Sequence, residues 1–211
     1  MILALCVAAG SALSLFRTLR RPAPKVHYGS FHGVGEAAAG ETIRLLNGQG
    51  RVVIWTADKG EIRDPAMEAT IDRFRRALRR GSRIRVLALE AVTLEGVNSM
   101  GVNDCLSPQQ LRTLLEKARE ADAVVSFAAL PLVSQAVAGQ LPDRRPNVVS
   151  AAFNTEPDAL RLLLEHDVAQ AGILLRRSLP AEGPRTPRTP REWFDQYFEV
   201  VTAKDAAALT P

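Results

Sequence analysis

Six polar residues follow short apolar runs of this sequence, at positions where a small polar molecule could bind. They are Asp58, Lys59, Asn154, Thr155, Glu156 and Arg176. Their side chains can donate and accept the hydrogen bonds that such a ligand needs. If the apolar runs are parallel strands, their carboxyl ends meet at one edge of a sheet, where open α/β folds bind ligands. The same residue types are common at ordinary strand ends and helix caps, so a purely structural role for these six residues is the alternative.

The residues that usually perform catalysis are sparse. Cys105 stands just before a predicted helix start, which can lower the pKa of a thiol, but no histidine lies near it in the sequence. Asp58, Glu61 and Asp64 could bind Mg²⁺, although acidic residues are also typical of the first turn of a helix. No GxxxxGK[ST] motif occurs, and no GxGxxG follows a strand-like run. We therefore expect no enzymatic activity, no cofactor and no metal ion.

A basic stretch at 72–85 contains seven arginines. The apolar residues of this stretch form the stripe of an amphipathic helix, which directs the arginines toward solvent. An acidic protein surface or an anionic lipid headgroup would complement their charge. We take Arg75, Arg79 and Arg83 as candidate partner-binding residues, with a solvated helix face as the alternative. Nucleic acid is not expected, because no aromatic residues alternate with the arginines.

A repeated Arg-Thr-Pro motif at 185–190 precedes a cluster of four aromatic residues, which are Trp193, Phe194, Tyr197 and Phe198. Prolines and threonines favour extended backbone in the repeat. Trp193 and Phe194 are candidate anchors for a partner protein, because aromatic side chains contribute strongly to interfaces. Packing of these rings in the core is the alternative.

The N-terminal segment is predicted to anchor the chain in a membrane. Residues 2–16 are apolar or small, and Arg17, Arg20 and Arg21 follow. A helix over 2–19 approaches the length of a bilayer span, because the arginine side chain can extend to the headgroups. We expect a retained single-pass anchor in a bacterial inner membrane, with a cleaved signal peptide as the rival. The positive-inside rule then places the following domain in the cytoplasm.

The chain is expected to contain one folded domain. The expected regions are an anchor at 1–20, a linker at 21–32, an α/β domain at 33–203 and a tail at 204–211. Within the domain, strands are predicted at 51–57, 83–92, 123–127, 147–153, 169–175 and 198–202. Helices are predicted at 33–47, 64–80, 131–140 and 192–198, and two more begin at the caps Ser107 and Thr155. The segment 91–106 is predicted as a long loop.

The alternation of these segments defines the fold class. The predicted strands are mostly apolar throughout, which is typical of parallel strands covered by helices on both faces. The sequence therefore predicts a doubly wound three-layer α/β sandwich with a mainly parallel sheet of five to six strands, preceded by one transmembrane helix.

The order of these segments resembles one lobe of the type I periplasmic substrate-binding proteins, in particular the sugar-binding members that serve ABC transporters. The similarity covers residues 33–177. It includes a helix ending in LLNGQG, the strand RVVIWTAD, a helix ending in FRRAL, the strand RIRVLALE, and the stretch LLEKAREADAVVSFAALPLVSQAVAG. The resemblance implies a periplasmic location as the alternative to the cytoplasm. Members of this family hold their ligand between two lobes, whereas this sequence has room for one.

Two functions are therefore expected. The first is a non-catalytic, membrane-anchored accessory or structural subunit of a membrane protein complex, in which the lobe binds protein partners. The alternative is a binding or sensor protein for a small, sugar-like ligand.

Overall fold

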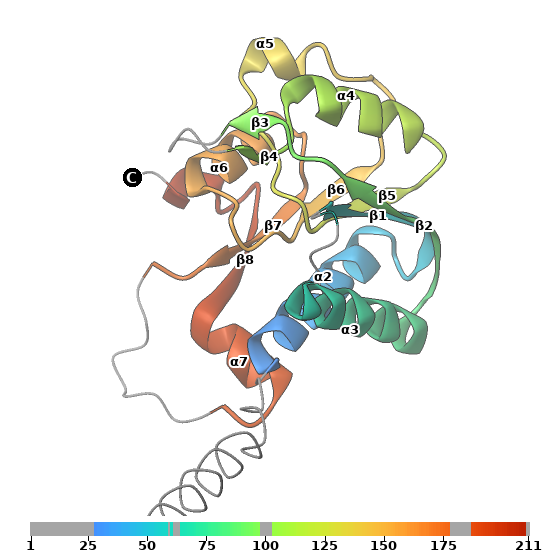
Figure 1. Cartoon of the computed structure of the whole chain (residues 1–211), viewed down its shortest axis with the longest axis vertical. Helices are drawn as coiled ribbons and strands as arrows, with labels where there is room; N and C mark the ends of the chain where they lie inside the picture. Colours follow the sequence, from blue (N-terminus) through green and yellow to red (C-terminus); the bar gives the residue numbers. More distant parts are fainter. Residues whose placement is uncertain (1–27, 59, 61–63, 98–102, 178–186, 210–211) are drawn as a thin grey trace, which may run out of the picture.

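A six-stranded sheet lies at the centre of the structure, a computed structural model that describes residues 28–58, 60, 64–97, 103–177 and 187–209 (Figure 1). The strands lie in the order β2-β1-β5-β6-β7-β8. The first five in this order are parallel to one another, and β8 is antiparallel to β7. Their bounds are β1 (Gln49–Ala57), β2 (Arg83–Val92), β5 (Ala123–Ser126), β6 (Asn147–Ser150), β7 (Ala171–Leu175) and β8 (Phe198–Thr202).

Helices cover both faces of this sheet (Figure 1). One face carries α2 (Gly29–Leu45), α3 (Pro65–Gly81) and α7 (Pro190–Tyr197). The other face carries α4 (Pro108–Lys117), α5 (Gln135–Ala138), α6 (Pro157–Glu165) and the short 3₁₀ helix η1 (Ala206–Leu209). Each face of the sheet buries its own apolar cluster, so the predicted three-layer α/β sandwich with a mainly parallel sheet is confirmed.

Several helices begin where their capping residues indicate. The Ser107 hydroxyl accepts a hydrogen bond from the Gln110 amide, and Pro108 occupies the first turn of α4. The Asp64 carboxylate accepts hydrogen bonds from the backbone amides of Ala66 and Met67 at the start of α3. These bonds satisfy amide groups that have no partner inside the helix.

Several local expectations differ from the structure. Helix α6 begins after Glu156, and Thr155 is instead buried with its hydroxyl 3.3 Å from that of Ser150. Helix α5 is limited to Gln135–Ala138, and β6 ends at Ser150 instead of continuing to 153. The predicted loop after β2 contains two short antiparallel strands, β3 (Gly96–Val97) and β4 (Asn103–Cys105).

The N-terminal end of α2 also differs, because α2 begins at Gly29 and not at Gly33. Both glycines face α7. A Cβ atom at Gly29 would overlap the indole of Trp193, and one at Gly33 would overlap the carbonyl oxygen of Pro190. The absence of side chains therefore lets α7 pack directly on the first turns of α2.

The expected membrane anchor at 2–19 lies outside the described residues. Within the part of the chain that the structure describes, no helix combines the length and the apolar character that a membrane crossing requires.

Candidate functional site

A hollow of about 560 Å³ lies at the carboxyl ends of β1, β5 and β6. Its volume is in the range typical of small-molecule sites, roughly 300–1,000 Å³. Its lining residues come from strand ends, from the start of α3 and from the segment after β2; they are Ala57, Asp58, Asp64, Met67, Thr93, Leu94, Asp104, Phe127, Ala128, Ala129, Phe153 and Asn154. The parallel order of the strands brings these segments together.

Asp58, Asp104 and Asn154 are among the polar residues that line this hollow, together with Asp64 and Thr93. Asp58 is exposed, and one of its carboxylate oxygens accepts a hydrogen bond from the backbone amide of Gly60 at 2.9 Å. The Asn154 side-chain amide donates to the backbone oxygen of Asp104 at 3.2 Å and lies 3.4 Å from its carboxylate. This contact fixes the orientation of Asn154 beside Asp104, and the structure adds Asp104 to the residues that sequence reasoning selected.

Two phenylalanines and a methionine supply the apolar part of the hollow. Phe127 is buried and Phe153 is half-buried. The Phe153 ring packs edge-to-face against Phe31 and Phe198, with centroid distances of 5.0 and 5.9 Å. These contacts hold Phe153 in place, and the hollow therefore combines a fixed aromatic surface with carboxylate oxygens.

The structure brings together only part of the predicted ligand-binding set. Asp58 and Asn154 line the same hollow, whereas Thr155, Glu156 and Arg176 do not. Arg176 donates from its Nε atom to the Phe198 carbonyl at 3.0 Å, which ties it to β8. Lys59 lies outside the described residues.

Two site residues that the sequence analysis did not select lie after strands, as the selected residues do. Phe127 comes directly after β5, and Phe153 lies three residues beyond the end of β6. A search for strand-end residues of every type would have found them, but our expectation considered polar side chains alone. Asp104 belongs to the segment after β2, and its place beside Asn154 depends on tertiary folding.

Cys105 is buried, with 8% of its surface exposed. Burial raises the pKa of its thiol, and the negative charges of Asp104 and Glu156 raise it further. The thiol therefore keeps its proton near neutral pH, which disfavours nucleophilic catalysis. Among the described residues, no group of three histidine, cysteine or acidic side chains is arranged to hold a metal ion.

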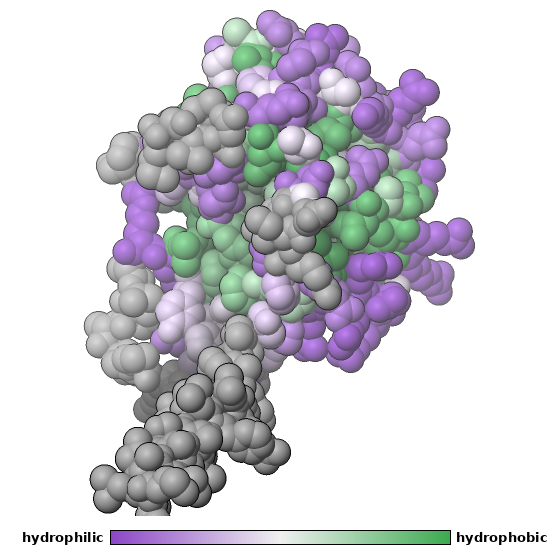
Figure 2. Space-filling view, viewed as in Figure 1, coloured by the Kyte–Doolittle hydropathy of each residue, from purple (hydrophilic) through white to green (hydrophobic). Residues whose placement is uncertain are grey.

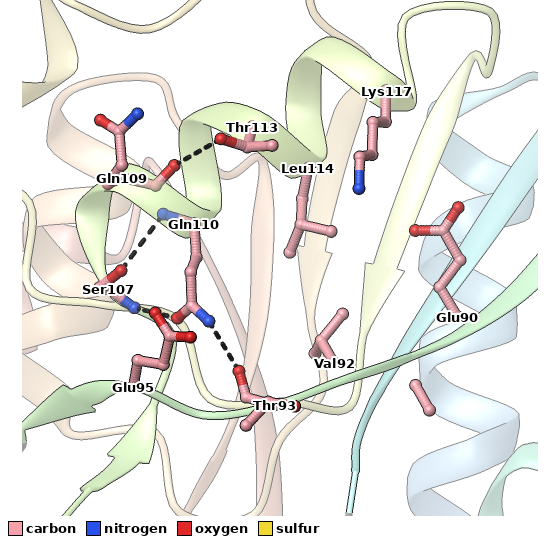
Figure 3. Close-up of a pocket in the computed structure, with 11 residues that line it drawn as sticks. Glu90, Val92, Thr93, Glu95, Ser107, Gln109, Gln110, Thr113, Leu114 and Lys117 are labelled. Atoms are coloured by element: carbon pink, nitrogen blue, oxygen red, sulfur yellow. Dashed lines mark hydrogen bonds between the residues drawn. The ribbon is translucent and has the colours of Figure 1, made fainter.

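A second hollow, of about 570 Å³, lies between the outer side of β2 and α4 (Figure 3). Val92 and Leu114 supply apolar surface, and Glu90 and Lys117 project into the space from opposite walls (Figure 3). Gln110 donates a hydrogen bond to the Thr93 carbonyl at 2.8 Å, which joins α4 to the segment after β2. This hollow lies beside a sheet edge and is separate from the strand-end hollow.

The candidate partner-binding residues fall into two groups. Arg75, Arg79 and Arg83 are exposed, and no carboxylate of the described residues pairs with them. Phe194, in contrast, is 3% exposed and packs in the core, so it offers no docking surface. The Trp193 ring is half-buried and stacks on Tyr197 at a centroid distance of 5.6 Å.

Comparison with solved structures identifies the fold. An arabinose-binding protein from Geobacillus stearothermophilus matches with a TM-score of 0.56 and 15% identity, over 86% of this chain and 63% of that one. A sugar-binding protein of a Bacillus halodurans sugar ABC transporter matches with a TM-score of 0.55 and 15% identity, over 89% of this chain and 69% of that one. An ABC transporter solute-binding protein from Burkholderia graminis was solved with D-arabinose. It matches with a TM-score of 0.53 and 18% identity, over 85% of this chain and 62% of that one.

The fold is that of the sugar-binding ABC solute-binding proteins. The resemblance to type I periplasmic substrate-binding proteins is thereby confirmed for the fold. This chain spans less than two thirds of the length of the Geobacillus and Burkholderia proteins. No family model matches the sequence, and no curated protein matches it.

Proposed function

We propose that this chain is a non-catalytic binding protein for a small polyhydroxylated, sugar-like ligand. The observation that carries the proposal is the strand-end hollow, in which Asp58, Asp104 and Asn154 lie with Phe127 and Phe153. The similar structures support it, since two of them are an arabinose-binding protein and a sugar-binding protein and a third was solved with D-arabinose.

The chemistry of the hollow suits a sugar. Hydroxyl groups of the ligand would donate hydrogen bonds to the carboxylates of Asp58 and Asp104, and bonds to ionised groups are stronger than those between neutral groups. The Asn154 carbonyl oxygen would accept another, because its amide nitrogen already bonds to Asp104. The C–H face of the sugar ring would pack on Phe153.

The expectation of a membrane-anchored accessory subunit stays a prediction. The similar structures favour ligand binding over that function. We also propose that the domain lies outside the cytoplasm, on the side where solute-binding proteins of this fold meet their ligands, in place of the cytoplasmic side that the arginines after the anchor predict. A fusion of alkaline phosphatase to the C-terminus tests this location, because the enzyme is active only after export.

Ligand-detected saturation-transfer NMR on the full chain in mild detergent tests the binding function. D-arabinose, D-galactose and D-xylose are the probes, and glycine and glycerol phosphate are the negative probes. We expect sugar binding that Asp58→Asn weakens about tenfold or more, because a hydrogen bond to a charged group contributes roughly 1.5–3 kcal/mol. The asparagine keeps an oxygen that can accept from Gly60.

The matched control is Asp143→Asn, which removes one carboxylate from an exposed position outside the hollow. It should bind sugar as the parent does. An absence of saturation transfer to all three sugars would contradict the proposal, as would equal binding by the parent and the Asp58→Asn variant.

A further inference from the structure

The outer edge of β2 has no partner among the strands that the structure describes. Strand β2 lies at one end of the sheet, and within the described residues it pairs only with β1. The Arg83 amide donates to Gly48, and the Val92 carbonyl accepts from Asp58, so these groups point toward β1. A bulge at Leu87 shifts the register between Val86 and Ala88, so backbone direction is counted back from Val92, which places the amides of Leu89 and Ala91 on the outer side. A strand edge of this kind can pair with another chain.

Two exposed leucines lie on this edge strand, and a hollow lies on each of its faces. Leu87 and Leu89 are 49% and 50% exposed. One hollow is the space against α4 in Figure 3, and the other, of about 300 Å³, lies between Leu89 and the α3 residues Met67 and Ile71. Figure 2 shows hydrophobic surface at this end of the sheet, between the hydrophilic side chains of α3 and α4. An added strand would direct alternate side chains into the two hollows.

The charge beside this edge is positive at the start of β2, whereas carboxylates line both hollows toward its other end: Glu90 and Glu95 on the α4 side, and Asp58, Asp64 and Glu68 on the α3 side. Arg83 and Arg85 begin β2, and both are exposed. Arg75 and Arg79 lie one and two turns beyond Ile71 on the same side of α3, which is the side that borders β2. Among the described residues, no carboxylate pairs with these four arginines, whereas the neighbouring Arg73 and Arg76 are paired with Glu36 and Asp72.

We propose that the outer edge of β2 binds an extended, acidic segment of a partner protein as an additional strand. Its acidic side chains contact the four arginines, its apolar side chains cover Leu87 and Leu89, and its backbone bonds to Leu89 and Ala91. A second copy of this chain is the alternative occupant that the test distinguishes, because antiparallel pairing about a two-fold axis would set Arg83 and Arg85 beside the Glu90 end of the other strand. Exposed arginines act mainly on the association rate, so binding weakens as salt rises.

Selection from a phage-displayed library of random peptides, about ten residues long, tests the proposal on the full chain in mild detergent. We expect enriched peptides that carry net negative charge and alternate apolar with polar residues. Fluorescence anisotropy with the most enriched peptide should show weaker binding on raising salt from about 50 to about 300 mM. The double variant Arg83→Ser/Arg85→Ser should weaken binding roughly tenfold. The matched control, Arg119→Ser/Arg144→Ser, removes two exposed arginines elsewhere and should bind as the parent does.

A separate variant tests the added strand. Ala91→Pro removes an outward amide at an edge, where proline is tolerated, and should abolish binding. If circular dichroism shows that this variant is unfolded, hydrogen exchange in the parent protein is measured instead. Addition of the peptide should then slow the exchange of the Leu89 and Ala91 amides. The proposal is wrong if no peptide is enriched, if the enriched peptides lack acidic bias, or if the Arg83→Ser/Arg85→Ser variant binds as the parent does. Self-association that this double variant abolishes would make a second copy the occupant and overturn the proposal.

Discussion

Ser107 and Gln110 exchange two hydrogen bonds at the start of α4. The Gln110 amide donates to the Ser107 hydroxyl at 3.2 Å, and the Ser107 amide donates to the Gln110 side-chain oxygen at 2.8 Å. This capping box satisfies two backbone amides that the helix and the preceding chain leave without a partner. The side-chain nitrogen of Gln110 also bonds to Thr93, so the same residue joins α4 to the segment after β2.

Ser107→Ala should lower the free energy of unfolding by about 1 kcal/mol, because the Gln110 amide loses its acceptor. The measurement is the midpoint of urea unfolding, followed by circular dichroism. Thr113→Ala is the control: Thr113 lies within the same helix, and its hydroxyl donates to the Gln109 carbonyl of the preceding turn, so its removal should leave the midpoint nearly unchanged. Equal midpoints for Ser107→Ala and the parent would show that the cap does not stabilise α4.

Gly33→Ala should destabilise the fold by about 1–3 kcal/mol, because the new methyl group overlaps backbone of α7 that cannot move without repacking. Gly40 lies in the same helix, and a Cβ atom there meets nothing within 4 Å. Gly40→Ala should therefore stabilise the chain by up to about 1 kcal/mol, since alanine favours a helix. Opposite shifts of the thermal midpoint are expected, and shifts of the same sign would contradict the packing of α7 on α2.

Asp205 should titrate below its ordinary range. The backbone amide and the hydroxyl of Thr202 donate to its carboxylate, at 3.0 and 2.8 Å, and these bonds lower the pKa of Asp205. The contribution to stability is present above the pKa of the unfolded chain, about 3.9, and is lost as pH falls through the lower folded pKa. Thr202→Val should raise the pKa of Asp205 in a carboxyl-detected NMR titration. An unchanged pKa in this variant would contradict the assignment.

The sequence predicted those parts of the fold that local patterns determine. The bounds of β2 agree with the prediction at both ends, because its apolar residues are flanked by Gly81-Ser82 and a polar segment. The start of α4 was predicted from Ser107, Pro108 and Gln110, whose interactions are local. Thr155 was wrong as a helix cap, since α6 begins after Glu156 and the Thr155 hydroxyl instead lies beside that of Ser150, five residues earlier, a contact that the capping pattern does not contain.

The candidate site was predictable to a smaller extent. Asp58 and Asn154 follow strands, and the parallel topology alone places them at one sheet edge. Arg176 also follows a strand, but its guanidinium bonds to the antiparallel neighbour β8, whose pairing the sequence does not specify. Asp104 joins the site because the neighbouring Cys105 forms an isolated parallel bridge with Ala129, in the segment that follows β5.

The buried thiol beside this site gives the last prediction. Cys105 follows Asp104, and burial together with the Asp104 and Glu156 carboxylates raises its pKa. The Cys6→Ser variant leaves Cys105 as the single thiol. Its alkylation by iodoacetamide should be slow. The midpoint of the alkylation rate plotted against pH should lie above the pKa of an ordinary cysteine, about 8.5. Asp104→Asn should move this midpoint down, since a negative charge near the thiol disfavours the thiolate.

Burial of the thiol and the nearby carboxylate charges both raise the pKa of Cys105, and alkylation rates measured against pH separate the two contributions. Unfolding in urea removes both, so the midpoint should fall to the ordinary value and the rate should rise. Asp104→Asn removes one charge and leaves the thiol buried, so its midpoint should lie between those of the folded parent and the unfolded chain. Asp143→Asn, which changes a distant carboxylate, should leave the midpoint of the folded chain unchanged. A folded parent that reacts with a midpoint below that of the unfolded chain would show an activated thiolate, and Cys105 would then have to be considered as a nucleophile beside the strand-end hollow.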